Sequence, residues 1–273
     1  MNPILFETKY FAINSLWFFI TIGIIAGTYA LIILAERNSL KLQFLSENTL
    51  KLILWTVIGA RVFAIIENYQ SYFYEFSLQT FLNLFYIWDK GLSFSGAVLA
   101  FFIYFYIICK KNNQDFFKWL DVLVPASLIA IAFGNIGAFF EGSNYGHETS
   151  LPWGVNFESP SIKYTVPIHP TQIYSFIYTA IIAAGLILIN RIEKFSNLEK
   201  TGFIGILGIT AYNFLRFLEE FLRGDDAIMI LGIRFPQIIA GLIAISAGIF
   251  LYLRYNSTTA KKIINKFKKT WKK

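Results

Sequence analysis

Long, uninterrupted apolar runs constrain the fold of this chain more than any other feature. Stretches such as 119–140 and 235–254 reach the roughly 18–20 apolar residues that cross a bilayer as a helix. Only helices and closed barrels span lipid, because every backbone polar group must be satisfied within the protein. Barrel strands alternate apolar and polar residues, whereas these runs are continuous. The sequence therefore predicts an all-α polytopic membrane protein.

The composition excludes an ordinary soluble domain. Hydrophobic residues make up 56% of the chain and charged residues only 15%, whereas about 25% of the residues of soluble proteins are charged. Cys109 is the single cysteine, so no intrachain disulfide can form. The net charge of +7 reflects the C-terminal KKIINKFKKTWKK, whose seven lysines suit a cytoplasmic, lipid-facing tail better than a nucleic-acid site.

We expect seven membrane-spanning helices in a single domain that covers residues 1–273. The first run is too long for the core of a signal peptide, and no basic segment precedes it, so we expect it to be retained as a helix. The predicted spans are about 10–35, 50–68, 91–109, 119–140, 171–190, 202–222 and 235–254.

Lysine and arginine gather on one side of the predicted membrane. Of the 24 basic residues, 17 fall in the segments 36–51, 110–118, 191–200 and 254–273. Because basic loops stay in the cytoplasm, the N-terminus is predicted to face outward and the C-terminus inward. We expect an aromatic interfacial arm at about 69–90 and a small head at about 141–170 on the outer face, and a basic cytoplasmic tail at 255–273.

Charged residues within the spans are functional candidates, because a charge at the bilayer centre costs at least ~2.5–3.5 kcal/mol. The string AYNFLRFLEEFLRGDD (211–226) carries the densest group. Glu220 and Arg223 follow Arg216 by four and seven residues, so a continuous helix would place all three on one face. Such a stripe can hold a phosphate through bidentate guanidinium contacts. The structural alternative is a salt-bridge ladder between helices.

Four more titratable side chains are predicted on the outer side. Arg61 and Arg234 add positive charge there and favour an anionic ligand. His169 precedes Pro170 at the start of the fifth span, where the helix dipole favours a neutral imidazole that can accept a proton from a thiol or hydroxyl. The alternative is a histidine that only organises the loop. Glu141 ends the fourth span, and no His, Cys and carboxylate cluster has metal-ligand spacing, so no metal site is expected.

Seven strings in the chain carry a family resemblance. They are GARVFAIIEN (59–68), WDKGLSFSGAVLA (88–100), DVLVP (121–125), GNIGAFFEGSNYG (134–146), LPWGV (151–155), HPTQIY (169–174) and YNFLRFLEEFLRGDD (212–226). Together they resemble the bacterial prolipoprotein diacylglyceryl transferase family, in the family's order and over most of the chain. HPTQIY and RFLEEFLRGDD are the distinctive members. Within GNIGAFFEGSNYG, Gly142 and Gly146 form a small-xxx-small pair that lets helices or loops approach closely.

The resemblance implies an enzyme of the bacterial cytoplasmic (inner) membrane with its active face outward. In that family phosphatidylglycerol is the donor, and the lipobox cysteine thiol of a pre-lipoprotein displaces glycerol phosphate to become a diacylglyceryl thioether. The family uses no metal or cofactor. The implied partners are therefore phosphatidylglycerol, a lipobox-bearing signal peptide and membrane lipid, with no nucleic acid.

The chain departs from the family's pattern at several positions. In the fourth-span signature, Asn135 stands where the family has Arg, and Glu141 stands where it has Asn. Ser95 stands where the family often has His, which removes one candidate base. The resemblance therefore leaves His169 or a carboxylate, of which Glu141 is best placed, to accept the thiol proton.

Carried onto this sequence, the motifs predict a set of site residues. The predicted catalytic residues are His169, Glu141, Glu220 and Arg216; the predicted lipid phosphate-binding residues are Arg216, Arg223, Arg61 and Asn135; the predicted supporting residues are Gln172, Tyr174, Ser95 and Asp226. Two alternatives to the transferase activity are a related lipid transferase with another donor or acceptor and a non-catalytic relative that binds lipid or lipoprotein.

Overall fold

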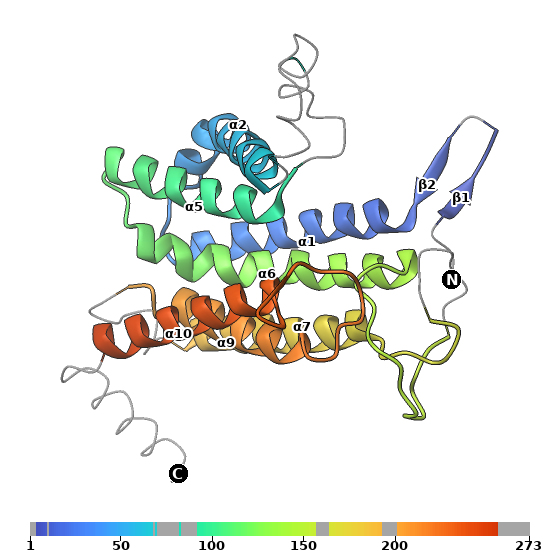
Figure 1. Cartoon of the computed structure of the whole chain (residues 1–273). Coiled ribbons are helices and arrows are strands. Elements are labelled where there is room, and N and C mark those ends of the chain that lie inside the picture. Colours follow the sequence, from blue (N-terminus) through green and yellow to red (C-terminus); the bar gives the residue numbers. More distant parts are fainter. Residues whose placement is uncertain are drawn as a thin grey trace. The chain divides into compact units, whose positions relative to one another are not determined.

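The computed structural model describes residues 4–9, 11–67, 69, 82, 92–156, 164–192 and 201–255, so the predicted arm at 69–90 and tail at 255–273 lie almost entirely outside it. The described part of the chain folds into seven helices and two short β-hairpins (Figure 1). The helices are α1 (Ser15–Arg37), α2 (Leu42–Glu67), α5 (Phe94–Lys111), α6 (Phe116–Glu141), α7 (Thr171–Arg191), α9 (Phe203–Glu219) and α10 (Phe235–Tyr255). The hairpins pair β1 (Ile4–Glu7) with β2 (Ala12–Asn14) and β3 (Met229–Ile230) with β4 (Ile233–Arg234).

Each predicted span overlaps one of these helices, which confirms the prediction of a helical fold. Five of them, α1, α2, α6, α7 and α10, are long and apolar enough to cross a membrane. The other two, α5 and α9, have 18 and 17 residues. The protein is therefore a helical membrane protein, while the count of seven spans stays a prediction.

Two helices begin at residues that differ from the predicted boundaries. α1 starts at Ser15 rather than near residue 10, because the β1–β2 hairpin occupies the preceding residues. Asn14 caps this helix by accepting a hydrogen bond from the Leu16 amide at 2.9 Å. α2 starts at Leu42, well before the predicted boundary near residue 50. The prediction missed its first turns because they are polar. Hydropathy marks the apolar part of a helix and misses polar turns at its ends.

The chain divides into two compact units, one formed by Met1–Asn38 with Phe117–Lys273 and the other by Ser39–Phe116. The first unit holds α1, α6, α7, α9 and α10, whose helices run alongside one another (Figure 1). A Cβ added to Gly23 of α1 would lie 2.7 Å from a backbone oxygen of α6, and one added to Gly205 of α9 would lie 2.6 Å from the α6 backbone at Leu120. Both α1 and α9 therefore pack directly against the backbone of α6.

Gly205→Ala is expected to destabilise the protein, because the added Cβ would meet the Leu120 carbonyl and push α9 away from α6. We expect the free energy of unfolding to fall by about 1–3 kcal/mol, the usual cost of overpacking. Thermal unfolding in detergent measures this change. Gly185→Ala is the matched control, because Gly185 lies in α7 with nothing within 4 Å of an added Cβ. Equal unfolding midpoints for the two variants would contradict the α6–α9 packing.

Asp121 of α6 fixes the start of α9. Its two carboxylate oxygens accept hydrogen bonds from the backbone amides of Gly202 and Gly205 at 2.7 and 2.8 Å. Both amides belong to the start of α9, where Gly202 supplies no capping side chain of its own. The aspartate of the DVLVP string therefore caps a helix distant in sequence.

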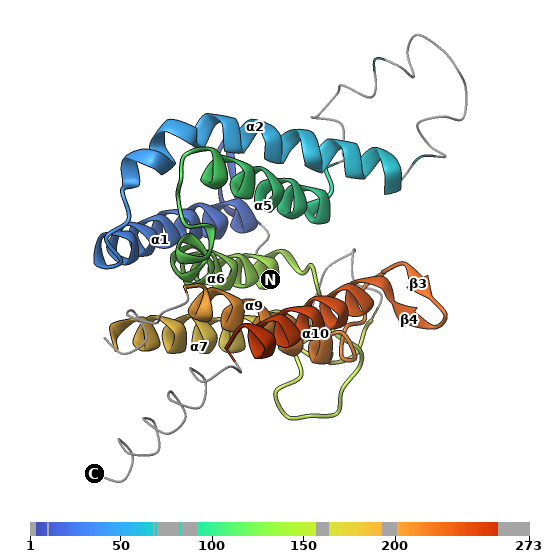
Figure 2. The ribbon, with the colours of Figure 1, turned by 90° about the vertical axis from the view of Figure 1, so that its left-hand side faces the viewer.

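The second unit, Ser39–Phe116, is formed by α2 and α5, which lie side by side (Figure 2). Gly59 of α2 and Gly96 of α5 face the neighbouring helix so closely that a Cβ on either would clash with it. At the start of α5, the hydroxyl groups of Ser93 and Ser95 share a hydrogen bond of 2.7 Å. This unit is therefore a tightly packed helical hairpin.

Residues 142–156 and 164–170 form a small head that connects α6 to α7. The head begins where α6 ends, because Gly142 adopts φ = +83°, in the left-handed region that favours glycine. Backbone hydrogen bonds join the two parts of the head, including a reciprocal pair between Val155 and Ile168 at 3.0 and 3.1 Å. The head thereby brings the end of α6 next to the start of α7.

Candidate active site

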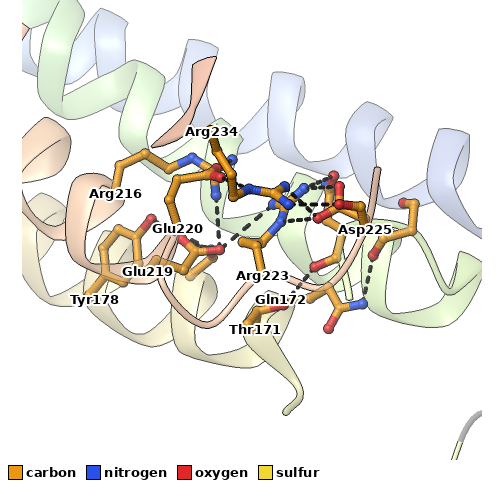
Figure 3. A network of polar contacts seen from close by, with 12 residues as sticks. Thr171, Gln172, Tyr178, Arg216, Glu219, Glu220, Arg223, Asp225 and Arg234 are labelled. Atoms are coloured by element: carbon orange, nitrogen blue, oxygen red, sulfur yellow. Dashed lines mark hydrogen bonds and ion pairs between the residues drawn. The ribbon is translucent and has the colours of Figure 1, made fainter. Parts of the chain in front are cut away.

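The end of α9 and the chain that follows it gather a network of three arginines and three carboxylates (Figure 3). The helix ends at Glu219, and in the tight turn after it the Leu222 amide donates to the Glu219 carbonyl at 2.8 Å. The prediction that Arg223 continues the helical face of Arg216 is therefore wrong, although both belong to the network. Its members are Arg216, Arg223, Arg234, Glu219, Glu220 and Asp225.

Glu220 is the most buried member of the network, with 1% of the residue exposed. Arg234 Nε donates to Glu220 Oε2 at 2.6 Å. Arg216 Nη2 lies 2.5 Å from Oε1, in an ion pair. A buried carboxylate has lost its hydration, so it depends on these two positive charges. Glu220 thereby joins the end of α9 to Arg234, which immediately precedes α10.

Glu219 is a second buried carboxylate and ties α9 to α7. Ser175 Oγ and Tyr178 Oη of α7 each donate to Glu219 Oε2 at 2.6 Å. Arg216 Nη1 donates to Oε1 at 2.9 Å, and Arg223 Nη1 lies 3.8 Å from the same oxygen. The guanidinium group of Arg216 is therefore held between two glutamates.

Arg223 fixes the turn after α9 and reaches the head. Its Nε and Nη2 donate to the two carboxylate oxygens of Asp225 at 2.7 and 2.5 Å, which makes a bidentate pair. Nη2 also donates to the side-chain oxygen of Asn144 at 2.8 Å. Burial alone would raise the pKa of Asp225, but the hydrogen bonds and charge of Arg223, with the charge of Arg234, outweigh it and hold that pKa below its ordinary value.

The network is electrically balanced, since three guanidinium groups face three carboxylates. The arginines differ in accessibility: the side chain of Arg216 is 22% exposed, against 6% for Arg223 and 12% for Arg234. Arg223 and Arg234 each hold Asp225, whereas Arg216 is held by glutamates of its own helix end. Arg216 is therefore the guanidinium best placed to bind an external anion.

The start of α7 is fastened to the strip that follows α6. Thr171 Oγ1 donates to the Asn144 carbonyl, and Gln172 Nε2 donates to the Ser143 carbonyl, both at 2.6 Å. The Gln172 Oε1 atom is buried and has no hydrogen-bond partner in the described part of the chain. Gln172, which lies near the network (Figure 3), thus keeps an unused acceptor.

Gly146 in the head and Gly224 after α9 allow segments of backbone to pack closely against one another. The Gly146 amide donates to the His169 carbonyl at 3.1 Å, and a Cβ at Gly146 would lie 2.6 Å from that same oxygen. A Cβ at Gly224 would lie 2.6 Å from the Gly146 carbonyl oxygen. The close approach predicted for Gly146 is confirmed, whereas Gly142 meets a different need through its positive φ.

His169 lies on the head immediately before α7, as predicted. Its Nδ1 lies 3.2 Å from Tyr174 Oη, which also accepts a hydrogen bond from Trp153 Nε1 at 2.7 Å. Burial lowers the pKa of His169 below its ordinary value of 6.5, and the neighbouring His147 lowers it further. The lowered pKa favours the neutral imidazole at pH 7. Its hydrogen bonds run to Tyr174 and the head rather than to the arginine network.

The six members of the network do not include the other predicted residues. Glu141 and Asn135 are half-buried on α6. Asp226 is exposed, and its neighbour Asp225 is the carboxylate that pairs with two arginines. Arg61 is 6% exposed within the second unit. Among the described residues, no three His, Cys, Asp or Glu side chains are grouped so that they could hold a metal ion.

The sequence patterns predicted no site role for four residues that belong to the network or contact it: Asp225, Asn144, Ser175 and Tyr178. Asp225 had a visible signal, because it lies beside the predicted Asp226 in the GDD string. Ser175 and Tyr178 are three residues apart and share a helical face, but no pattern indicates that this face meets α9. Asn144 reaches the network only because the chain reverses direction after α6.

Known proteins resemble this chain over most of its length. The family model described as prolipoprotein diacylglyceryl transferase matches residues 3–254. The phosphatidylglycerol–prolipoprotein diacylglyceryl transferase of Clostridium tetani is 32% identical over 257 residues, which cover 92% of this chain and 97% of the relative. The corresponding proteins of Finegoldia magna and Gloeobacter violaceus are 31% and 28% identical, over 92% and 91% of this chain and 95% and 92% of their own lengths. The matched region includes the whole arginine network.

Proposed function

Because the chain belongs to the prolipoprotein diacylglyceryl transferase family, we propose that its arginine network serves the transfer of a diacylglyceryl group from phosphatidylglycerol to a prolipoprotein. In the proposed step the thiol sulfur of a lipobox cysteine bonds to the glyceryl carbon, while the bond between that carbon and the phosphate oxygen breaks. Glycerol phosphate leaves with the bonding electrons, and a protein base accepts the thiol proton.

The exposure of Arg216 within a charge-balanced network carries this proposal. Glu219 and Glu220 align its guanidinium group, so its remaining donor capacity can meet phosphate oxygens without reorganisation. Negative charge grows on the phosphate as the carbon–oxygen bond breaks, and a fixed cation stabilises that charge. Arg61 and Asn135 are the further candidates for headgroup contacts, and Arg223 acts by fixing the turn that carries Asp225.

His169 and Glu141 are the two candidates for the base that accepts the thiol proton. The lowered pKa of His169 favours a neutral imidazole, which can accept a proton, and so supports His169 as the base. Tyr174 Oη can accept a hydrogen bond from Nδ1–H, which would leave Nε2 with a free lone pair for the proton. Glu141 lies at the junction between α6 and the head, where the family has an uncharged residue.

The pH dependence of transfer distinguishes these two bases. If His169 is the base, kcat/KM falls at pH values below 6.5, because the imidazole gains a proton as the pH drops through its lowered pKa. His169→Asn is expected to remove this acidic limb, since the amide does not titrate but can still bond Tyr174. Initial transfer rates over a range of pH measure the effect. An acidic limb that persists in His169→Asn and disappears in Glu141→Gln would assign the base to Glu141.

The proposed topology has seven spans, with the N-terminus outside and the C-terminus inside. At one end of the first unit, Arg254 Nη2 donates to the Thr201 carbonyl at 3.0 Å and Arg37 Nη2 donates to the Arg191 carbonyl at 3.2 Å. The arginine–carboxylate network lies at the other end, because α9 runs from beside Thr201 to Glu219. Basic helix ends stay in the cytoplasm, which supports a network at the outer face of the bacterial cytoplasmic membrane.

Complementation tests the proposed function in cells. Expression of the wild-type chain in bacteria depleted of their own diacylglyceryl transferase is expected to restore growth and lipoprotein maturation. Lipid analysis of the same cells detects the alternative, a lipid transferase with another donor or acceptor. Failure to complement, at membrane levels matched to those of an active control enzyme, would overturn the proposal.

A further inference from the structure

Arg234 contacts the network differently from Arg216. Its Nε donates to Glu220 Oε2 at 2.6 Å, its Nη1 to the Asp225 backbone carbonyl at 2.7 Å, and its Nη2 to Asp225 Oδ1 at 2.9 Å. The side chain is only 12% exposed. All three nitrogens are therefore directed at acceptors of the protein, so Arg234 is poorly placed to bind an external phosphate itself.

Arg234 joins the two ends of the segment that contains the β3–β4 hairpin. It ends β4 immediately before α10, and both of its partners precede β3. The Phe235 amide next to it donates to the Ile228 carbonyl at 2.8 Å, which closes the base of the same hairpin. Glu220 offers one carboxylate oxygen to Arg234 and the other to Arg216. Arg234 therefore fixes the carboxylate that in turn fixes Arg216.

From these contacts we infer that Arg234 is a positioning residue for the anionic donor lipid, acting through Glu220 on Arg216. The inference rests on the proposed function, since it concerns the same phosphate site. Removal of Arg234 leaves two arginines facing three carboxylates, and thus one net negative charge beside that site. Of the two described arginines that pair with Glu220, Arg216 then remains, and Glu220 competes with the phosphate for it. Binding of the anionic donor weakens, while the uncharged acceptor thiol is not affected.

Arg234→Gln tests this inference by its separate effects on the KM for the donor and the KM for the acceptor peptide. The apparent KM for phosphatidylglycerol is expected to rise about tenfold, the size of one lost charge-assisted hydrogen bond, with the KM for a lipobox peptide unchanged. Arg234→Lys keeps the charge but cannot span both carboxylates, so we expect an intermediate KM for the donor. Arg254→Gln, at the opposite end of α10, is the matched control and is expected to change neither KM. A purely structural role would lower the amount of active protein without changing the donor KM.

A binding measurement separates this inference from the transfer activity itself. Micelles that contain phosphatidylglycerol, compared with phosphatidylcholine micelles, are expected to raise the thermal unfolding midpoint of the wild type and of Arg254→Gln. The rise is expected to be smaller in Arg234→Lys and smallest in Arg234→Gln; if the glutamine variant does not fold, the lysine variant decides. If phosphatidylglycerol stabilises the wild type more than the Arg234 variants, but the wild type carries out no transfer, the proposed function fails and the inference stands. If the folded Arg234 variants kept both the phosphatidylglycerol-dependent stabilisation and the donor KM of the wild type, the inference would be overturned.

Discussion

Arg216→Ala is expected to lower kcat/KM for phosphatidylglycerol by about 10²–10³-fold, the usual loss when one preorganised donor to a developing negative charge is removed. Arg216 is the most exposed of the three arginines, and two glutamates already hold its guanidinium group in place. The other two arginines of the network cannot replace it, because Arg223 and Arg234 are committed to Asp225. Initial rates of diacylglyceryl transfer to a lipobox peptide measure the loss.

Two further variants show whether the loss comes from the site. Arg216→Lys retains one positive charge without the bidentate geometry, so it is expected to recover only part of the activity. Arg37→Ala removes an arginine that donates to the Arg191 carbonyl at the other end of the unit, and it is expected to keep wild-type activity. Near wild-type kcat/KM in Arg216→Ala would remove this arginine from the proposed mechanism.

Glu220→Gln is expected to lower the free energy of unfolding by about 3–5 kcal/mol, because it leaves two guanidinium groups without their shared buried counter-charge. Both Arg216 and Arg234 lie within 2.6 Å of the Glu220 carboxylate, which is 1% exposed. For a protein of this size such a loss corresponds to a fall in the thermal unfolding midpoint on the order of 10 °C. Thermal unfolding in detergent, followed by circular dichroism, measures it.

Glu148→Gln is the matched control for this stability effect. Glu148 lies on the head and is exposed, so loss of its charge is expected to change the free energy of unfolding by no more than about 0.5 kcal/mol. If Glu220→Gln unfolded at the same temperature as Glu148→Gln, the network would not stabilise the end of α9 as described.

The apolar runs predicted the helices well because burial in lipid imposes a continuous apolar stretch on any helix that crosses it. The polar ends of helices carry no such signal. The apolar run beginning near residue 10 therefore did not indicate that a β1–β2 hairpin precedes α1. α2 begins at Leu42, and hydropathy does not detect its first, polar turns.

The candidate site was predictable only where residues interact along one helix. The spacing of Arg216 and Glu220 predicted a contact, and the structure confirms it. Arg223 was misplaced because the helix ends at Glu219, a boundary that the charged string does not mark. The contacts of Ser175 with Glu219, and of Asn144 with Arg223, depend on how α7 and the head fold back against α9. Such contacts between segments distant in sequence leave no local pattern.

Mass spectrometry of a lipobox peptide incubated with the purified chain and phosphatidylglycerol tests the central claim most directly. The account predicts that the peptide gains the mass of one diacylglyceryl group on its cysteine, that this gain requires phosphatidylglycerol, and that Arg216→Ala slows it about 10²–10³-fold. A peptide that stays unmodified by the folded wild-type chain, under conditions in which an active control enzyme modifies it, would contradict the account.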